Sequence, residues 1–174
     1  MKKQESTRIH YGIQPSPFGP CLIGAIDGKI CKVSFLDKPS SSKAEGELRK
    51  LWPKAELMHD DKTIKPFIAK LFGPAKGKKS IPFILKGTPF QIKVWKALMA
   101  IPEGKTKTYK EVARAIGSPK AFRAVGSACG KNPIGMLIPC HRVLASDGSL
   151  GGFGWGLDRK ESMLAWEATQ TSKK

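Results

Sequence analysis

The sequence predicts a mixed α/β (α+β) protein, with a small antiparallel sheet in its N-terminal half and a mainly helical C-terminal half. Two apolar runs, residues 21–26 and 29–35, flank Asp27-Gly28, a dipeptide typical of two-residue β-hairpin turns. Thr88 and Thr108 are each followed three residues later by Gln or Glu, the pattern of a helix capping box. With 174 residues and 40% hydrophobic content, the chain can bury one or two real cores.

The N-terminal half predicts scaffold elements and no catalytic constellation. We expect a first strand at 11–13, before the hairpin strands, and a loop at 39–42, where a proline precedes three serines. A short helix is predicted at 45–52, where Pro53 ends it, and another at 65–72.

A basic segment rich in helix breakers, Gly-Pro-Ala-Lys-Gly-Lys-Lys-Ser at 73–80, separates the two halves. Such segments are typical of domain connections. We therefore expect an N-terminal supporting domain at 1–80 and a C-terminal domain at 81–174.

Two short helices joined by a glycine-containing turn make a helix-turn-helix candidate in the second half. The first begins after Thr108 and ends at Gly117; the second follows Ser118-Pro119. The apolar spacing predicts that the second helix buries Ala121, Ala124, Val125 and Ala128. The same helix would direct outward Phe122, Arg123, Gly126 and Ser127.

The charge balance favours a polyanionic partner. Lys and Arg number 31 against 14 Asp and Glu, which gives a net charge of +17 and a pI near 9.9. No apolar run reaches the length of a membrane span, and the first residues lack the apolar core of a signal peptide. We therefore expect a cytoplasmic protein associated with the nucleoid through DNA.

The four cysteines include no Cys-x-x-Cys pair, so a disulfide scaffold is not expected. In the N-terminal half, Cys21, Cys31, His10 and His59 are the candidate metal ligands. Their spacing matches no zinc template, and we predict no metal.

The run from Met136 to Leu144 places a thiol, an imidazole and a guanidinium inside an apolar stretch, as Cys140, His141 and Arg142. A buried cysteine is usually an unreactive small hydrophobe. Here Pro139 disfavours a central strand, while the neighbouring base and cation would lower the thiol pKa. On an extended chain adjacent side chains point to opposite faces, so a water between His141 and Cys140 is one possibility.

These residues carry a family resemblance. Asn132-Pro133, followed by Ile-Pro-Cys-His-Arg-Val at 138–143, resembles the active-site signature of the O6-alkylguanine-DNA alkyltransferases, and the likeness runs from about Gly87 to Glu167. The chain is most similar to the bacterial form found as the methyltransferase half of the adaptive-response regulator. The resemblance implies an RNase H-like N-terminal half, and transfer of an alkyl group from guanine to Cys140.

The resemblance also implies catalytic roles. Glu167 orients His141, which keeps Cys140 as thiolate; Asn132 ties the helix pair to the reactive segment, and the Tyr109 hydroxyl assists the departing guanine. A carboxylate on the apolar stripe of the last helix needs a partner, and His141 is the candidate. The alternatives are a Glu167 exposed by fraying of the helix and an Asn132 that only forms a turn.

For DNA the resemblance implies a minor-groove approach by the helix-turn-helix. Arg123 would fill the place of a flipped nucleotide, and Tyr109 would help to rotate its phosphate. The alternatives are a solvated Arg123 and a Tyr109 that is half-buried core. The remaining predicted DNA contacts are Ala121, Phe122, Gly126, Ser127, Lys131 and Arg142.

A glycine-rich loop at 151–156 lacks the Lys-Ser or Lys-Thr of a phosphate-binding loop. The resemblance instead implies that it forms a wall of the alkylguanine pocket. A bulky Trp155 would narrow this pocket, so we predict poor reaction with benzylguanine. The predicted pocket residues are Met136, Val143, Phe153, Gly154, Trp155 and Lys160.

The predicted reaction is a single displacement that leaves a thioether on Cys140, so each molecule acts once. No cofactor is expected, the partner is double-stranded DNA with alkylated guanine, and the protein is expected to be a monomer. Whether O4-alkylthymine is accepted stays open. The alternatives are a cysteine hydrolase, a helix-turn-helix regulator and a non-catalytic damage sensor.

Overall fold

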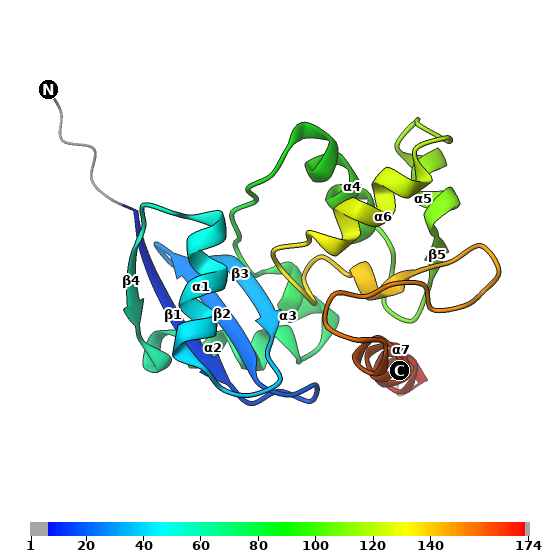
Figure 1. Ribbon diagram of the computed structural model, residues 1–174. Coiled ribbons are helices and arrows are strands. Elements are labelled where there is room, and N and C mark those ends of the chain that lie inside the picture. The colour runs from blue at the N-terminus through cyan, green and yellow to red at the C-terminus, as the bar shows by residue number, and fades with distance from the viewer. Residues whose placement is uncertain (1–6, 173–174) are drawn as a thin grey trace, which may run out of the picture. The chain divides into compact units, whose positions relative to one another are not determined.

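The computed structural model describes residues 7–172. The chain has the predicted mixed α/β architecture and divides into two compact units, Met1–Lys86 and Gly87–Lys174 (Figure 1). The division falls after Lys86, six residues beyond the boundary expected from the sequence. Backbone hydrogen bonds from Ile30 to Pro82 and from Ile84 to Ile30 attach this short segment to a strand of the first unit.

The first unit is built on a four-stranded sheet in the order β3-β2-β1-β4. Its hairpin has the predicted turn, because Asp27 and Gly28 both adopt positive φ angles, 50° and 79°, as a type I′ turn requires. The strands are β1 (Arg8–Gln14), β2 (Cys21–Ile26), β3 (Lys29–Phe35) and β4 (Glu56–His59).

The sheet is mixed, so the expectation of a purely antiparallel sheet is wrong. Strand β4 pairs in parallel with β1, in a register that sets Ile9 opposite Leu57. The sequence did not predict β4 because it is a short edge strand. Of its four residues only Leu57 is partly buried, so it has too little apolar alternation to be recognised.

Helices α1 (Ser41–Leu51) and α2 (Asp61–Leu71) pack against opposite faces of the sheet (Figure 1). On one face, Ile9 and Tyr11 share a core with Leu48 of α1. On the other, Gly12 meets α2 so closely that an added Cβ would lie 2.5 Å from Asp61 Oδ1. The short helix α3 (Ala75–Lys79) follows.

Both helices begin four residues before the predicted starts, because polar residues cap them. The Ser40 hydroxyl accepts the backbone N–H of Lys43, and the Asp60 carboxylate accepts that of Thr63. The run of serines read as a loop therefore supplies a helix N-terminus.

The second unit is mainly helical, and both predicted capping boxes, at Thr88 and Thr108, are present. Trp95 belongs to the core, and its indole N–H donates to the Ala128 carbonyl at 2.9 Å. A two-residue parallel pair joins β5 (Lys107–Thr108) to β6 (Val143–Leu144). The helices are α4 (Pro89–Met99), α5 (Tyr109–Ala115), α6 (Phe122–Gly130) and α7 (Leu157–Ser172).

Helices α5 and α6 form the predicted helix pair, joined by a turn in which Gly117 has a φ of +79°. Val125 and Ala128 are buried as expected, whereas Ala124 is exposed. The buried face is set instead by the spacing of Val125, Ala128 and Cys129 on α6. Within residues 7–172, every helix is too short or too polar to cross a membrane.

Two glycines of the first unit test whether the backbone conformation at each position requires glycine. Gly28→Ala should lower the free energy of unfolding by about 1 kcal/mol, because its φ of +79° is unfavourable for any residue with a Cβ. Gly46→Ala should raise it by about 0.5–1 kcal/mol, since an added Cβ on α1 meets open space. Thermal unfolding midpoints that move the same way for both variants would contradict this assignment.

Candidate active site

Cys140 is the first residue of a single 3-10 turn, η1 (Cys140–Arg142), rather than part of the extended chain considered from the sequence. Pro139, with φ −82° and ψ 65°, bends the chain, and its carbonyl accepts the Arg142 N–H at 3.0 Å. The turn allows Cys140, His141 and Arg142 to leave the backbone in different directions, without the strict alternation of a strand.

The side chain of Asn132 forms a hydrogen bond with the thiol of Cys140. Its side-chain amide donates to the Ile138 carbonyl at 2.7 Å and to Cys140 Sγ at 3.2 Å. Its oxygen accepts the Ile134 N–H at 2.9 Å. Because this amide is buried and bonded to backbone on both sides, it fixes the path of the chain from α6 to η1.

The carboxylate of Glu167 on α7 is fully buried and forms hydrogen bonds with two residues of the turn η1. His141 Nε2 lies 2.6 Å from Glu167 Oε1, as the sequence predicted, so a frayed and exposed Glu167 is excluded. Arg142 donates from Nη2 at 2.6 Å and from Nε at 2.9 Å to the two carboxylate oxygens. Arg142 Nη1 also donates to the Ile101 carbonyl at 2.6 Å.

The charge of Glu167 determines the tautomer of His141. Burial raises the pKa of Glu167, but the hydrogen bonds and positive charges of His141 and Arg142 outweigh it and lower the pKa to about 2. At neutral pH the carboxylate is ionised and can only accept, so Nε2 of His141 carries a proton. In the neutral imidazole the lone pair then lies on Nδ1, which makes Nδ1 the basic nitrogen of the ring.

Arg142 is not placed to contact DNA, contrary to the expectation from the sequence. Its side chain is buried and its guanidinium is occupied by Glu167 and the Ile101 carbonyl. Breaking that pair would leave a buried carboxylate short of its main partner, which costs several kcal/mol. Arg142 therefore supports the turn from inside.

The cation that acts on the thiol is Lys160 rather than Arg142. Burial raises the pKa of Cys140 to about 11, against the smaller lowering effects of the Asn132 hydrogen bond and the Lys160 charge. In the resting protein Cys140 is thus a neutral thiol. A reaction through sulfur needs a base to remove its proton during the reaction.

Lys160 is fully buried on α7, and its Nζ donates to backbone carbonyls that surround it. Its acceptors are Val143 at 2.6 Å, Gly152 at 3.2 Å and Leu150. Burial lowers the pKa of Lys160. Lys160 ties the glycine-rich loop to η1 and does not line the cavity described next, although it was predicted as a pocket residue.

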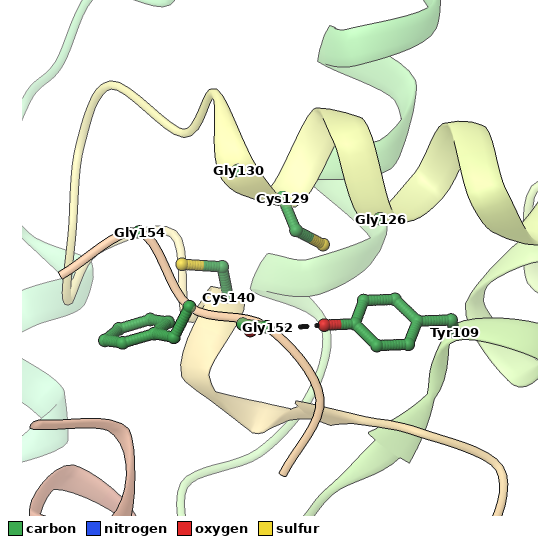
Figure 2. Close-up of a pocket in the computed structure, with 8 residues that line it drawn as sticks. Tyr109, Gly126, Cys129, Gly130, Cys140, Gly152 and Gly154 are labelled. Atoms are coloured by element: carbon green, nitrogen blue, oxygen red, sulfur yellow. Dashed lines mark hydrogen bonds between the residues drawn. The ribbon is translucent and has the colours of Figure 1, made fainter. Parts of the chain in front are cut away.

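A cavity of about 350 Å³ opens over the thiol (Figure 2). Figure 2 shows Cys140 and Cys129 facing it from η1 and α6, with Tyr109 opposite and its hydroxyl donating to the Gly152 carbonyl at 3.4 Å. Burial raises the pKa of Tyr109. The lining residues are Tyr109, Gly126, Cys129, Gly130, Cys140, Gly152, Phe153 and Gly154.

Sequence reasoning placed the glycine-rich loop, with Phe153 and Gly154, in this pocket and missed Cys129 and Gly130 on α6. Helical spacing carried the missing signal, because residues three and four positions after Gly126 share its face of α6. Small residues dominate the wall, which leaves room for a planar group.

Three other predicted pocket residues lie outside the lining. Trp155 packs edge-on against Phe153, a lining residue, with ring centroids 5.4 Å apart and planes at 82°. Met136 is buried with a φ of 65°, and Val143 is buried with its carbonyl bonded to Lys160. Poor reaction with benzylguanine stays a prediction.

The remaining DNA candidates lie on or next to α6. Arg123, Ser127 and Lys131 are exposed, as a nucleic-acid contact requires. Ala121 and Phe122 are partly buried, and Lys110 Nζ lies 5.5 Å from the Phe122 ring centroid. A shallow hollow next to this pair is lined by Ser118, Pro119, Lys120 and Ala121.

The four candidate zinc ligands of the first unit do not converge. His10 pairs with Asp60 at 3.1 Å and His59 with Asp61 at 3.0 Å, while Cys21 and Cys31 are buried in the sheet. Across residues 7–172 no group of three or more His, Cys, Asp or Glu side chains is arranged to hold a metal ion.

Comparison with known proteins finds a family model that matches most of the second unit and relatives that match nearly the whole chain. A family model described as "6-O-methylguanine DNA methyltransferase, DNA binding domain" matches residues 89–169. A methylated-DNA–protein-cysteine methyltransferase of Methanosarcina barkeri is 42% identical over 163 residues, which cover 91% of this chain and 97% of that protein.

The bifunctional transcriptional activator/DNA repair enzyme Ada of Escherichia coli is 35% identical over 94% of this chain. The chain spans about half of that relative's length, 47%. Among solved structures, a Mycobacterium tuberculosis OGT in complex with DNA has a TM-score of 0.72 and 32% identity, with 92% of this chain and 94% of that chain covered.

The Asn132 hydrogen bond to sulfur can be tested by Asn132→Asp. The carboxylate cannot donate to Sγ and adds a negative charge beside it, so the apparent pKa of Cys140 should rise by about one unit or more. The pH dependence of iodoacetamide alkylation, followed on the peptide that holds Cys140, measures this shift. Alkylation of both proteins in denaturant is the control; unchanged native profiles would refute the role.

The buried carboxylate predicts a specific loss of stability in acid. The pKa of Glu167 falls from 4.5 to about 2 on folding, so its contribution is complete above pH 4.5 and is lost as the pH falls toward 2. Glu167→Gln should lower stability at pH 7 by about 3–5 kcal/mol, because Arg142 is left buried without its counter-charge. Thermal unfolding between pH 5 and 2 should then show a flatter curve for the variant; parallel curves would contradict the assignment.

Proposed function

Because the chain belongs to the methylated-DNA–protein-cysteine methyltransferase family, we propose that it repairs DNA by moving an alkyl group from O6 of guanine to its own Cys140. The observation that carries this proposal is the position of Cys140. Its thiol faces a cavity lined mainly by small residues and accepts a hydrogen bond from Asn132. The next residue of the same turn, His141, pairs with the buried Glu167 of α7.

The basic charge and the helix pair account for DNA binding. A net charge of +17 supports backbone contacts that release counterions. Arg123, Ser127 and Lys131 present their exposed side chains on or just after α6, next to the helix positions that form part of the cavity wall. A helix whose exposed side chains lie beside the pocket suits an enzyme that must extrude a nucleotide, because guanine O6 is inaccessible inside the stack.

In the proposed complex, Arg123 occupies the space left by the extruded base and Tyr109 contacts the rotated phosphate. A repair protein must act in any sequence context, so backbone and shape contacts suit it better than base readout in the major groove. The approach is therefore from the minor groove.

The proton of Cys140 leaves during the reaction. The thiol is neutral at rest, with its pKa raised by burial, and His141 presents its Nδ1 lone pair as the acceptor, directly or through a water. Glu167 stabilises the imidazolium that forms, and Arg142 keeps Glu167 ionised. Lys160 adds a positive charge near the sulfur as the thiolate develops.

The thiolate then displaces guanine from the alkyl carbon. The S–C bond forms as the C–O6 bond breaks, and the electron pair leaves on guanine, which takes a proton or hydrogen bond from the Tyr109 hydroxyl. The product on Cys140 is a thioether with no leaving group that water can displace, so each molecule reacts once. The protein's own residues supply every group in these steps, and we place the reaction in the cytoplasm, with the chromosome.

The proposal predicts stoichiometric repair that depends on Cys140. With a duplex carrying one O6-methylguanine, wild-type protein should remove one lesion per molecule and then stop. Cys140→Ser should remove none and still bind the duplex, because the hydroxyl is a far weaker nucleophile of similar size. Counting the remaining lesions after excess duplex is added measures the plateau.

Cys21→Ser is the matched control, since Cys21 lies in the sheet of the first unit. It should repair as the wild type does. Continued turnover by the wild type would indicate a hydrolase, and binding without any repair would indicate a damage sensor or regulator. Either result would refute the proposal.

A further inference from the structure

A second thiol shares the reaction cavity, and the mechanism above gives it no role. Cys129 on α6 lines the same cavity as Cys140, and Figure 2 shows both side chains in the space between α6, η1 and the glycine-rich loop. The other two cysteines, Cys21 and Cys31, lie in strands of the first unit.

The two thiols are also electrostatically coupled. Ionisation of Cys140 opposes ionisation of Cys129, and Lys160 favours the thiolate of each. Coulombic coupling inside a protein falls with distance, so the two sulfurs belong to one local environment. On the α6 side the wall beside Cys129 is made of glycines, Gly126 and Gly130, and the rings of Tyr109 and Phe153 complete the lining.

We propose that Cys129 is a second nucleophile of the reaction cavity, which captures alkyl groups that carry a leaving group on their second carbon. The proposal rests on alkyl transfer to Cys140 as its first step. The substrate class is O6-(2-haloethyl)guanine in DNA, and the product is an ethylene bridge between the two sulfurs.

The chemistry balances without an added reagent. In the first step Cys140 receives the 2-haloethyl group, its proton leaves, and guanine departs with the electron pair of the C–O6 bond. The Cys140 sulfur then displaces halide to form a three-membered sulfonium ion. The Cys129 sulfur attacks one ring carbon, which opens the ring, and its proton is released with the halide. Two S–H bonds are thereby replaced by two S–C bonds.

The cavity favours capture by Cys129 over capture by water. Two reacting groups held in one pocket have an effective concentration far above that of a solute. Burial raises the pKa of Cys129 to about 12, so this thiol is unreactive toward ordinary substrates. A strained sulfonium beside it is a strong electrophile, and its positive charge favours loss of the Cys129 proton.

A bridge through two carbons also places weaker geometric requirements on the two sulfurs than a direct disulfide does. A disulfide needs the sulfurs about 2 Å apart and a specific dihedral angle, in addition to an oxidant. An ethylene link places three bonds between the sulfurs and needs neither. The biological consequence is that the reactive intermediate is quenched inside the protein before it alkylates DNA.

Trypsin makes the product easy to read, because Lys131 lies between the two cysteines. Cleavage separates residues 124–131, which hold Cys129, from residues 132–142, which hold Cys140. A bridge keeps these two peptides joined, and hydrolysis of the intermediate instead leaves a hydroxyethyl group on the second peptide alone.

The test treats wild-type protein with a duplex freshly prepared to contain O6-(2-chloroethyl)guanine. We expect the joined peptides as the main product, and a hydroxyethyl group on Cys140 in Cys129→Ser. Cys31→Ser, the control, should form the bridge as the wild type does. Wild-type protein that ends with hydroxyethyl on Cys140 and an unmodified Cys129 would overturn the proposal.

Two further experiments distinguish capture by Cys129 from the alkyl transfer to Cys140 on which it rests. An O6-methylguanine duplex should methylate Cys140 equally in wild type and Cys129→Ser; failure in both would refute the proposed function and this inference with it. The second experiment uses 1,2-dibromoethane with the protein alone, which needs no DNA. Methyl transfer without a bridge from either reagent would overturn the role of Cys129 alone.

Discussion

The buried carboxylate of Glu167 is the contact on which the second unit's site depends. It binds His141 and Arg142 at once, and so joins the last helix, α7, to the turn that carries Cys140. An isolated buried charge would be strongly unfavourable, and here two donors from adjacent residues compensate it. The tautomer of His141 and the attachment of the turn to α7 follow from this arrangement.

The site separates fixed charges from the groups that change protonation. Glu167 is ionised at neutral pH and forms the support with Arg142, while in the proposed mechanism Cys140 and His141 are the groups that exchange a proton. The ammonium group of Lys160 donates to backbone carbonyls of the loop and of β6.

The sequence was informative where local chemistry decides structure. The turn at Asp27-Gly28, the capping boxes at Thr88 and Thr108 and the His141–Glu167 pairing each rest on residue types with strong local preferences or on a charge that needs a partner.

It was uninformative where tertiary context decides. The edge strand β4 has too little apolar pattern of its own, and the direction of Arg142 depends on where α7 packs. The place of Trp155 beside Phe153 is likewise a packing result that spacing cannot supply. Cys129 lies outside the signature around Cys140, and only the packing of α6 over η1 brings it to the same cavity.

The mass of the protein after reaction with a duplex that carries one O6-methylguanine shows whether Cys140 accepts the alkyl group. We expect a gain of one methylene per molecule, located by peptide mapping on residues 132–142, which contain Cys140. An unchanged mass, or a methyl group on any other cysteine while Cys140 stays free, would contradict alkyl transfer to Cys140.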